Sequence, residues 1–148
     1  MKFFIPVLTA VAFLTGGAAA LDKGVLLGET FGGPHGHKYS DLGIISPGQI
    51  TTFLRHGGKG GVAKTLDLAE DEHIIGIQAH WAKYYRHTRI MYIEFTTDAG
   101  NTISAGSPTD KIGKDSAPEG YQLGGFVGYS GNELDSVGAI STSIDPVE

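Results

Sequence analysis

Short stretches in which apolar and polar residues alternate dominate the chain beyond its first twenty positions. The clearest spans 88–97, where Met91, Ile93 and Phe95 fall on one face and mostly polar side chains on the other. A second stretch, 73–81, alternates in the same way. Because successive side chains of a strand point to opposite faces, this period of two predicts half-buried β-strands.

Turn-forming residues separate these stretches from further predicted strands. The 23 glycines recur at short intervals instead of gathering in one linker, and this spacing is typical of an all-β domain with many tight turns. No segment shows the period of a long helix. We therefore predict additional strands over 25–31, 39–46, 49–56, 62–68, 102–105, 121–129 and 134–143, with an irregular segment over 106–120.

The first twenty residues have a different character. Lys2 precedes an almost wholly apolar run over 3–14, and small residues follow at 18–20. This order predicts a cleaved secretory signal over 1–20, followed by a single domain over 21–148. The apolar run is shorter than the roughly 20 residues that cross a bilayer, so we expect a secreted protein without a membrane span. The chain has no cysteine, and its stability is expected to come from packing and hydrogen bonds.

Charge and motif content argue against several functions. The net charge of -5 is unlike that of a general nucleic-acid binder, which has a basic surplus. A glycosidase needs two carboxylates facing each other across a sugar bond, and the acidic residues here lie mostly in turns with no reason to converge. The segment Gly128-Tyr129-Ser130-Gly131 is one residue shorter than the Gly-x-Ser-x-Gly elbow of a hydrolase. We expect no enzymatic activity and no cofactor.

Two histidines raise the question of a metal site. His35 and His37 are two residues apart, and on a strand they would share a face, with Asp41 nearby. In a glycine-rich loop such histidines are more often exposed polar residues, and no third ligand is specified. The sequence therefore predicts no metal.

A glycine-rich turn near the end of the sequence carries the main candidate chemistry. Gly131 is followed four residues later by Asp135, at the turn between two predicted strands. Backbone N–H groups of such a turn donate hydrogen bonds while the carboxylate accepts two from neighbouring hydroxyls, which is the chemistry that holds a sugar. By itself the spacing is more often that of an ordinary hairpin turn, whose aspartate bonds nearby backbone N–H groups.

The order and spacing of several motifs resemble the jacalin-related lectins over nearly the whole of 21–148. These motifs are Phe31-Gly32-Gly33-Pro34-His35-Gly36 with Tyr39-Ser40-Asp41, Gly57-Gly58, the acidic turn before Ile74-Ile75-Gly76-Ile77, the run 93–100, and Gly125-Phe126-Val127-Gly128 before 131–135. The resemblance implies a β-prism I fold: three four-stranded antiparallel Greek-key sheets with pseudo-threefold symmetry. The strand pattern alone fits a sandwich or a Greek-key barrel equally well.

The resemblance also implies where a sugar would bind. Gly131 would leave room for the ligand, while the N–H groups of Asn132 and Glu133 would donate to it. Asp135 would accept from two adjacent hydroxyls, and Gly36 would add a further amide. Glu133 brings a negative charge that should disfavour anionic sugars. In the family, a preference for galactose goes with a chain cleavage that frees the α-amino group of the glycine. No processing signal precedes Gly36 here, so the implied ligand is a mannose- or glucose-type sugar of a glycan.

The chain departs from the family pattern in its aromatic residues. The aromatic residue that many members place in the Gly-x-x-x-Asp turn is missing, so Tyr85 or His87 of the basic loop 83–87 is the candidate to cover the apolar face of the sugar. The alternative is that both are exposed loop residues without a ligand. The Gly-x-x-x-Asp spacing recurs at 106–110, but Pro108 lacks an N–H, and one site is expected instead of two.

A second function remains open on the sequence. Lys and Arg residues fall mostly in loops, so the chain is alternatively a binding module for sulfated glycans or anionic lipid headgroups. The glycines at 57–61 look like half of a further sugar site that has no partner turn. A single sugar site is weak, because hydrogen bonds to water are exchanged for hydrogen bonds to protein. Useful avidity would come from a homo-oligomer, whose size the sequence does not fix.

Overall fold

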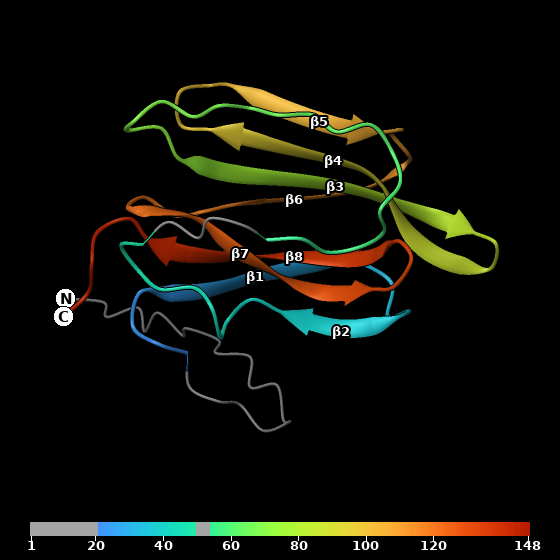
Figure 1. The fold of residues 1–148 in the computed structure, drawn as a ribbon, viewed down its shortest axis with the longest axis horizontal. Helices are drawn as coiled ribbons and strands as arrows, with labels where there is room; N and C mark the ends of the chain where they lie inside the picture. The colour runs from blue at the N-terminus through green and yellow to red at the C-terminus, as the bar shows by residue number, and fades with distance from the viewer. Residues whose placement is uncertain (1–20, 50–53) are drawn as a thin grey trace, which may run out of the picture.

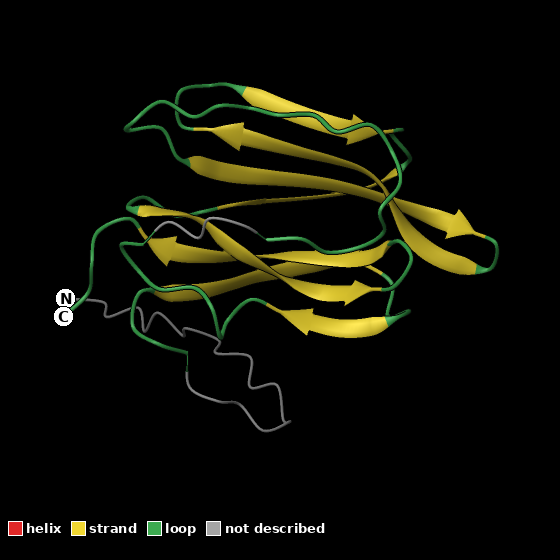
Figure 2. Ribbon diagram, viewed as in Figure 1, coloured by secondary structure: helices red, strands yellow, loops and turns green. Residues whose placement is uncertain are grey.

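The computed structural model describes residues 21–49 and 54–148, and this part of the chain is all-β. Figure 2 shows strands joined by loops, without a helix in the described ranges. Accordingly, those ranges contain no helix long and apolar enough to cross a membrane. The predicted signal over 1–20 lies outside the described residues and stays a prediction.

Eight antiparallel strands form two four-stranded sheets, which lie one above the other in Figure 1. The first sheet, in the order β1-β8-β7-β2, consists of β1 Val25–Gly32, β8 Leu134–Ser143, β7 Tyr121–Ser130 and β2 His37–Ser40. The second sheet, in the order β5-β4-β3-β6, consists of β5 Thr102–Gly106, β4 His87–Thr97, β3 Ile74–Tyr84 and β6 Lys111–Ser116.

The main hydrophobic core lies between the two sheets. Ile77 and Ala79 of β3 are buried in one cluster with Val137 and Ala139 of β8, in agreement with the alternation predicted for 73–81. Strand β8 is buried continuously over 135–142. A fully buried Val or Ile side chain contributes about 1.5–3 kcal/mol, and β8 supplies Val137 to this core and Ile140 to a second cluster with Val25 and Ile45.

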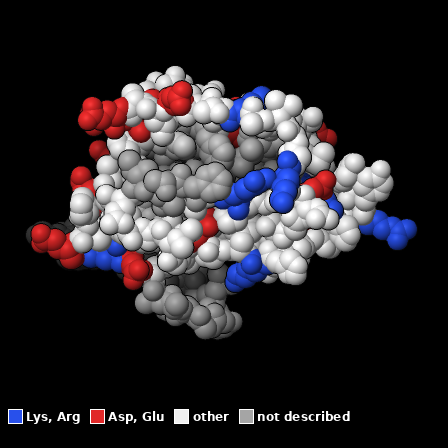
Figure 3. Space-filling view, viewed as in Figure 1, with Lys and Arg blue, Asp and Glu red and all other residues white. Residues whose placement is uncertain are grey.

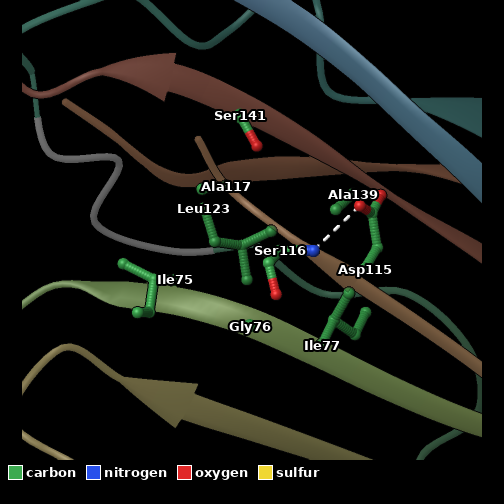
Figure 4. Close-up of a pocket in the computed structure, with 9 residues that line it drawn as sticks. All are labelled: Ile75, Gly76, Ile77, Asp115, Ser116, Ala117, Leu123, Ala139 and Ser141. Carbon is green, nitrogen blue, oxygen red and sulfur yellow. Dashed lines mark hydrogen bonds between the residues drawn. The ribbon is translucent and has the colours of Figure 1, made fainter. Parts of the chain in front are cut away.

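A small gap remains between the sheets beside β6. Figure 4 shows its lining, which includes Ile75, Leu123 and Ala139, with the Ser116 N–H donating to Asp115 Oδ1 (2.8 Å). The cavity measures about 10 Å³, which is room for about one water molecule. It is a packing gap and too small for a sugar.

Several predicted strands are confirmed, among them 25–31, 73–81, 88–97, 102–105 and the final hairpin 121–129 with 134–143. The prediction of an irregular segment over 106–120 was wrong for its middle, where β6 pairs with β3. That strand has few apolar side chains, and it is stabilised by the ladder instead of by its own pattern.

The strands predicted over 39–46 and 62–68 do not form as expected. Strand β2 ends at Ser40, because the Ile44 N–H donates to Asp41 O (2.9 Å) and closes a turn. Residues 62–68 are coil, with Val62 89% exposed. The strand predicted over 49–56 falls partly outside the described residues. The described ranges therefore hold two sheets instead of the three that the resemblance implied.

Polar contacts tie the segment after β2 to the first sheet in place of a strand ladder. The buried Asp41 carboxylate accepts from the Phe126 N–H (2.8 Å) and contacts His56 Nε2 (2.9 Å). The His56 ring in turn stacks on Tyr39, with centroids 3.9 Å apart. Burial, with a smaller effect of the Asp41 charge, raises the pKa of the Tyr39 hydroxyl well above its ordinary value. The hydroxyl therefore stays protonated and donates to Ser136 O (2.9 Å).

Glu72 anchors the acidic turn that precedes β3. Its buried carboxylate accepts from the Ala69 N–H (3.0 Å), the Thr97 hydroxyl (2.5 Å) and the Asn101 amide (2.6 Å). These hydrogen bonds, that of Ala69 first, lower the pKa of Glu72. A lowered pKa in the folded state adds stability above the ordinary carboxyl pKa of about 4.3, and this stability is lost as the pH falls through the lowered value.

Replacing Glu72 by Gln should therefore lower the melting temperature at pH 7, and the deficit should shrink as the pH falls below about 4. The measurement is thermal unfolding of both proteins between pH 2.5 and 7. The control is Glu70→Gln, an exposed acid of the same turn, which should change little. A deficit that is the same at every pH would contradict the assigned role of the charge.

Candidate functional site

The turn between β7 and β8 presents backbone donors. Residues 131–133 connect the strands, and the Gly131 N–H donates to Glu133 O (2.9 Å), which closes the turn on itself. The amides of Asn132 and Glu133 donate to no acceptor in the described part of the chain. Both are thus free to donate to a ligand.

The loop between β1 and β2 lies next to this turn, at the right-hand end of the first sheet in Figure 1. Because His37 pairs with Ser130 across β2 and β7, Gly36 is brought beside Gly131: a Cβ on Gly131 would lie 3.8 Å from Gly36 Cα. Gly36 itself has φ +78°, and a Cβ there would lie 2.5 Å from Ser130 O. Only glycine fits this position. Within the described ranges its N–H also has no acceptor.

Asp135, the first buried residue of β8, places its carboxylate under these two loops. Its backbone carbonyl accepts from the Gly33 N–H (3.0 Å). Its side chain is buried, with Oδ1 accepting from Arg89 Nη1 (2.8 Å). Oδ2 has no partner among the described residues, and the position of a Cβ on Gly36 would be 3.0 Å from it. One unsatisfied carboxylate oxygen therefore faces the Gly36 loop.

Arg89 is the site residue that the sequence reasoning missed. Its Nε lies 2.5 Å from Glu133 Oε2, although the N–H does not have hydrogen-bond geometry toward that oxygen. Its side chain is only 20% exposed, so the guanidinium bridges two carboxylates in a largely enclosed position. One signal in the sequence could have found it. Arg89 stands two residues before Met91 and so shares the apolar face of the predicted strand.

The start of β4 forms the third wall of the site. His87 Nδ1 lies 3.0 Å from His35 Nδ1, with the two rings edge to face and their centroids 4.2 Å apart. The next residue, Thr88, packs so closely on Gly33 that a Cβ there would lie 2.6 Å from Thr88 Cβ. A register shift in the ladder between β3 and β4 lies just beyond, where Trp81 pairs with Ile90. Such shifts re-aim side chains.

The structure separates the two predicted aromatic candidates. Tyr85 and Arg86 form a two-residue hairpin turn with φ 47° and 71°, the left-handed pair that such turns require. Tyr85 is 79% exposed at its tip, where its ring meets Tyr84 (centroids 4.4 Å). His87, in contrast, reaches the Gly36 loop through His35. The predicted basic loop 83–87 is thus a tight turn, and of Tyr85 and His87 only His87 contacts the loop that carries Gly36.

An open cavity of about 360 Å³ adjoins the ion pairs. Its lining consists of Tyr84, Arg89, Ile90, Met91 and Glu133. This volume lies within the usual range of small-ligand sites, and it combines an aromatic ring with charged groups. Tyr84 therefore lines this space, whereas its neighbour Tyr85 does not.

The histidines do not gather as a metal site. Asp41 is occupied by His56, and His35 pairs with His87 instead of acting with His37. Over the described ranges no group of three His, Asp or Glu side chains is arranged to hold a metal ion.

The second Gly-x-x-x-Asp spacing has a different geometry. Gly106 ends β5, and the Ser107 N–H, which corresponds to that of Asn132, already donates to Met91 O (2.8 Å). Together with Pro108, this leaves the turn without the donors that the first turn offers. That the chain has one sugar site stays a prediction.

The glycines at 57–58 pack against the back of the first turn. A Cβ on Gly58 would lie 2.0 Å from Asn132 O, and one on Gly57 would lie 3.3 Å from Leu134 N. This loop therefore supports the candidate site, whereas the sequence suggested half of a separate one.

The family model described as "Jacalin-like lectin domain" matches residues 39–140 of this chain. The chain is similar to Secreted RxLR effector protein 19 of Plasmopara viticola, with 27% identity over 95% of this chain and 93% of that protein. It is 30% identical to Jacalin-related lectin 40 of Arabidopsis thaliana over 78% of this chain, but spans only 26% of that longer protein.

A solved structure with a similar fold is AcmJRL, described as a mannose binding jacalin related lectin from Ananas comosus. The TM-score is 0.65 at 17% identity, covering 81% of this chain and 99% of that chain. At this identity the likeness concerns the fold alone.

The contact between Gly58 and Asn132 predicts the effect of Gly58→Ala. The new methyl group has to displace the Asn132 carbonyl, and such overpacking costs about 1–3 kcal/mol. We expect a melting temperature lower by several degrees and shifted amide resonances at Asn132 and Glu133. Gly60→Ala is the matched control, since a Cβ there meets nothing within 4 Å. Equal effects of the two substitutions would mean that the loop does not support the turn.

Proposed function

Because this chain belongs to the jacalin-like lectin family, we propose that it is a carbohydrate-binding protein that recognises a mannose- or glucose-type sugar without chemical conversion. The single observation that carries the proposal is the convergence of free backbone donors from two loops on one buried carboxylate. The loops come from distant parts of the sequence, and their glycines meet. Such an arrangement suits a ring of hydroxyl groups better than any other common ligand.

Each group has a defined role in the proposal. The N–H groups of Gly36, Asn132 and Glu133 donate to sugar oxygens, and Asp135 accepts from hydroxyls. Gly131 keeps its side free of a side chain, so the sugar approaches the main chain. The apolar face of the sugar packs on an aromatic residue from the β3–β4 hairpin. His87 and Tyr84 are better positioned for this contact than Tyr85 is.

The preference for mannose- or glucose-type sugars rests on two arguments. Gly36 follows His35 in a continuous chain, so its nitrogen is a peptide donor and not a free amine. The similar lectin from Ananas comosus is described as mannose binding. The site has two carboxylates, Glu133 and Asp135, and one guanidinium, that of Arg89. Its net negative charge favours a neutral ligand over an anionic one.

The finer fold assignment belongs to the same proposal. We infer a β-prism in which the described sheets are two faces and the segment after β2 supplies the third. In support, the segment after residue 54 runs as coil alongside the sheets in Figure 1, and Lys64 Nζ donates to Ser104 O of β5 (2.7 Å). Family membership and the fold likeness to AcmJRL favour the same arrangement.

We further propose secretion and association into a homo-oligomer. Secretion is supported by the sequence of 1–20 and by the name of the relative from Plasmopara viticola. Association would combine several weak sites into useful avidity on a glycan surface.

The proposal predicts the result of titration calorimetry on residues 21–148. Methyl α-mannoside should bind and methyl α-galactoside should bind more weakly. Asp135→Asn should weaken mannoside binding by about tenfold or more, because hydrogen bonds to a charged acceptor contribute about 1.5–3 kcal/mol. The control is Asp110→Asn at the second Gly-x-x-x-Asp spacing, an exposed position where affinity should not change. Absence of binding to either sugar by the folded protein would refute the proposed function.

Salt distinguishes this function from binding of sulfated glycans or anionic headgroups. Figure 3 shows Lys and Arg side chains mostly over the middle and right of the visible face, with a further group at the lower left, and the β7–β8 turn lies toward the right in the same view. Charge-driven binding should weaken steeply between 0.05 and 0.5 M NaCl, whereas neutral-sugar binding should change little. We expect salt-insensitive mannoside binding; strong salt-sensitive binding of heparin without mannoside binding would favour the basic surface.

A further inference from the structure

The guanidinium of Arg89 stands where the hydroxyls of a ligand would donate. A sugar that is read by Asp135 has to place O–H groups against the carboxylate oxygens. In the structure, Oδ1 already accepts from Arg89 Nη1 at 2.8 Å. The Asp135 side chain is 1% exposed, and the unpaired Oδ2 is closed off from solvent. In this arrangement Asp135 is not accessible to a ligand.

The contact between Arg89 and Asp135 is also the stronger kind of hydrogen bond. An arginine N–H on a carboxylate joins two opposite charges, whereas a sugar O–H on the same carboxylate has only the charge of the acceptor. A neutral sugar therefore exchanges a stronger bond for a weaker one when it displaces Arg89 from Oδ1. The displacement lowers the net affinity for such a sugar.

The surroundings give Arg89 a place to move. The cavity of about 360 Å³ lies next to its side chain and is open beside Glu133. Glu133 is 48% exposed, and its carboxylate already contacts Arg89 Nε. Arg89 can leave Asp135 while it keeps Glu133 as its partner, so its own charge stays paired, and the hydroxyls of the ligand take over the hydrogen bonds to Asp135.

We propose that Arg89 is a specificity-determining residue, an internal competitor that occupies Asp135 until a ligand displaces it. This inference rests on the proposed sugar-binding function. In this proposal, Arg89 keeps the affinity for single neutral sugars low. A glycan that makes further contacts around the cavity offsets the free-energy cost of displacing Arg89, and a free monosaccharide does not.

The test is titration of methyl α-mannoside into Arg89→Ala. Truncation opens the enclosed space to water, so that the Asp135 carboxylate is hydrated and both oxygens become available. We expect mannoside affinity to rise about tenfold over the wild type. Arg86→Ala removes the same charge from the neighbouring hairpin turn and should leave the affinity within twofold of the wild type. In the double variant Arg89→Ala, Asp135→Asn, the gain should disappear.

The outcomes separate this inference from the function on which it rests. If the wild type binds mannoside and Arg89→Ala binds it with equal or lower affinity, the role of Arg89 is overturned and the lectin function stays intact. A measurable wild-type affinity for mannoside that rises in Arg89→Ala would support both. No binding by any of the folded proteins would refute the function and the inference with it. If Arg89→Ala does not fold, Arg89→Lys serves in its place: with a weaker hold on Asp135, it should show a smaller gain, and no gain would count against the role.

Discussion

The buried carboxylate of Asp135 is the constraint on which the site depends. A charge enclosed in a protein interior is very costly unless it is paired and hydrogen-bonded. Arg89 supplies the pairing from β4, and Gly33 fixes the backbone of Asp135 from the loop after β1. One residue of β8 thus joins both sheets at the end where the free amides gather. The same pairing uses part of the hydrogen-bonding capacity that a ligand would need.

Close approach of backbones is the second requirement, and glycine meets it. Gly36 adopts a left-handed conformation against Ser130, and Gly58 lies against the carbonyl of Asn132. No side chain could replace either without moving the turn that carries the free amides. Gly36 belongs to the site directly, whereas Gly58 acts from behind it. This distinction between lining and supporting glycines is invisible in a list of motifs.

The segment after β2 shows how polar contacts can replace a ladder. Asp41, His56 and Tyr39 form a hydrogen-bonded and stacked group that holds this segment on the first sheet. A buried carboxylate therefore secures two attachments of the first sheet. Asp41 holds the irregular segment after β2, and Asp135 links the first sheet to the second. Each accepts a hydrogen bond from an element far away in the sequence, Asp41 from the Phe126 N–H and Asp135 from Arg89.

Local pattern determined the strands in which alternation is strong, such as β3, β4 and the β7–β8 hairpin, because period-two burial is written in consecutive residues. It failed for β6, whose pairing depends on a neighbour, and for 62–68, whose apolar residues find no partner strand. The motif order also determined Gly36, Gly131 and Asp135 as candidates, and the structure brings these three together. Only the tertiary structure decided that Arg89 covers Asp135, that His87 meets His35 and that Gly58 supports the turn. Contacts between distant segments depend on sheet register and loop closure, and a linear pattern encodes neither.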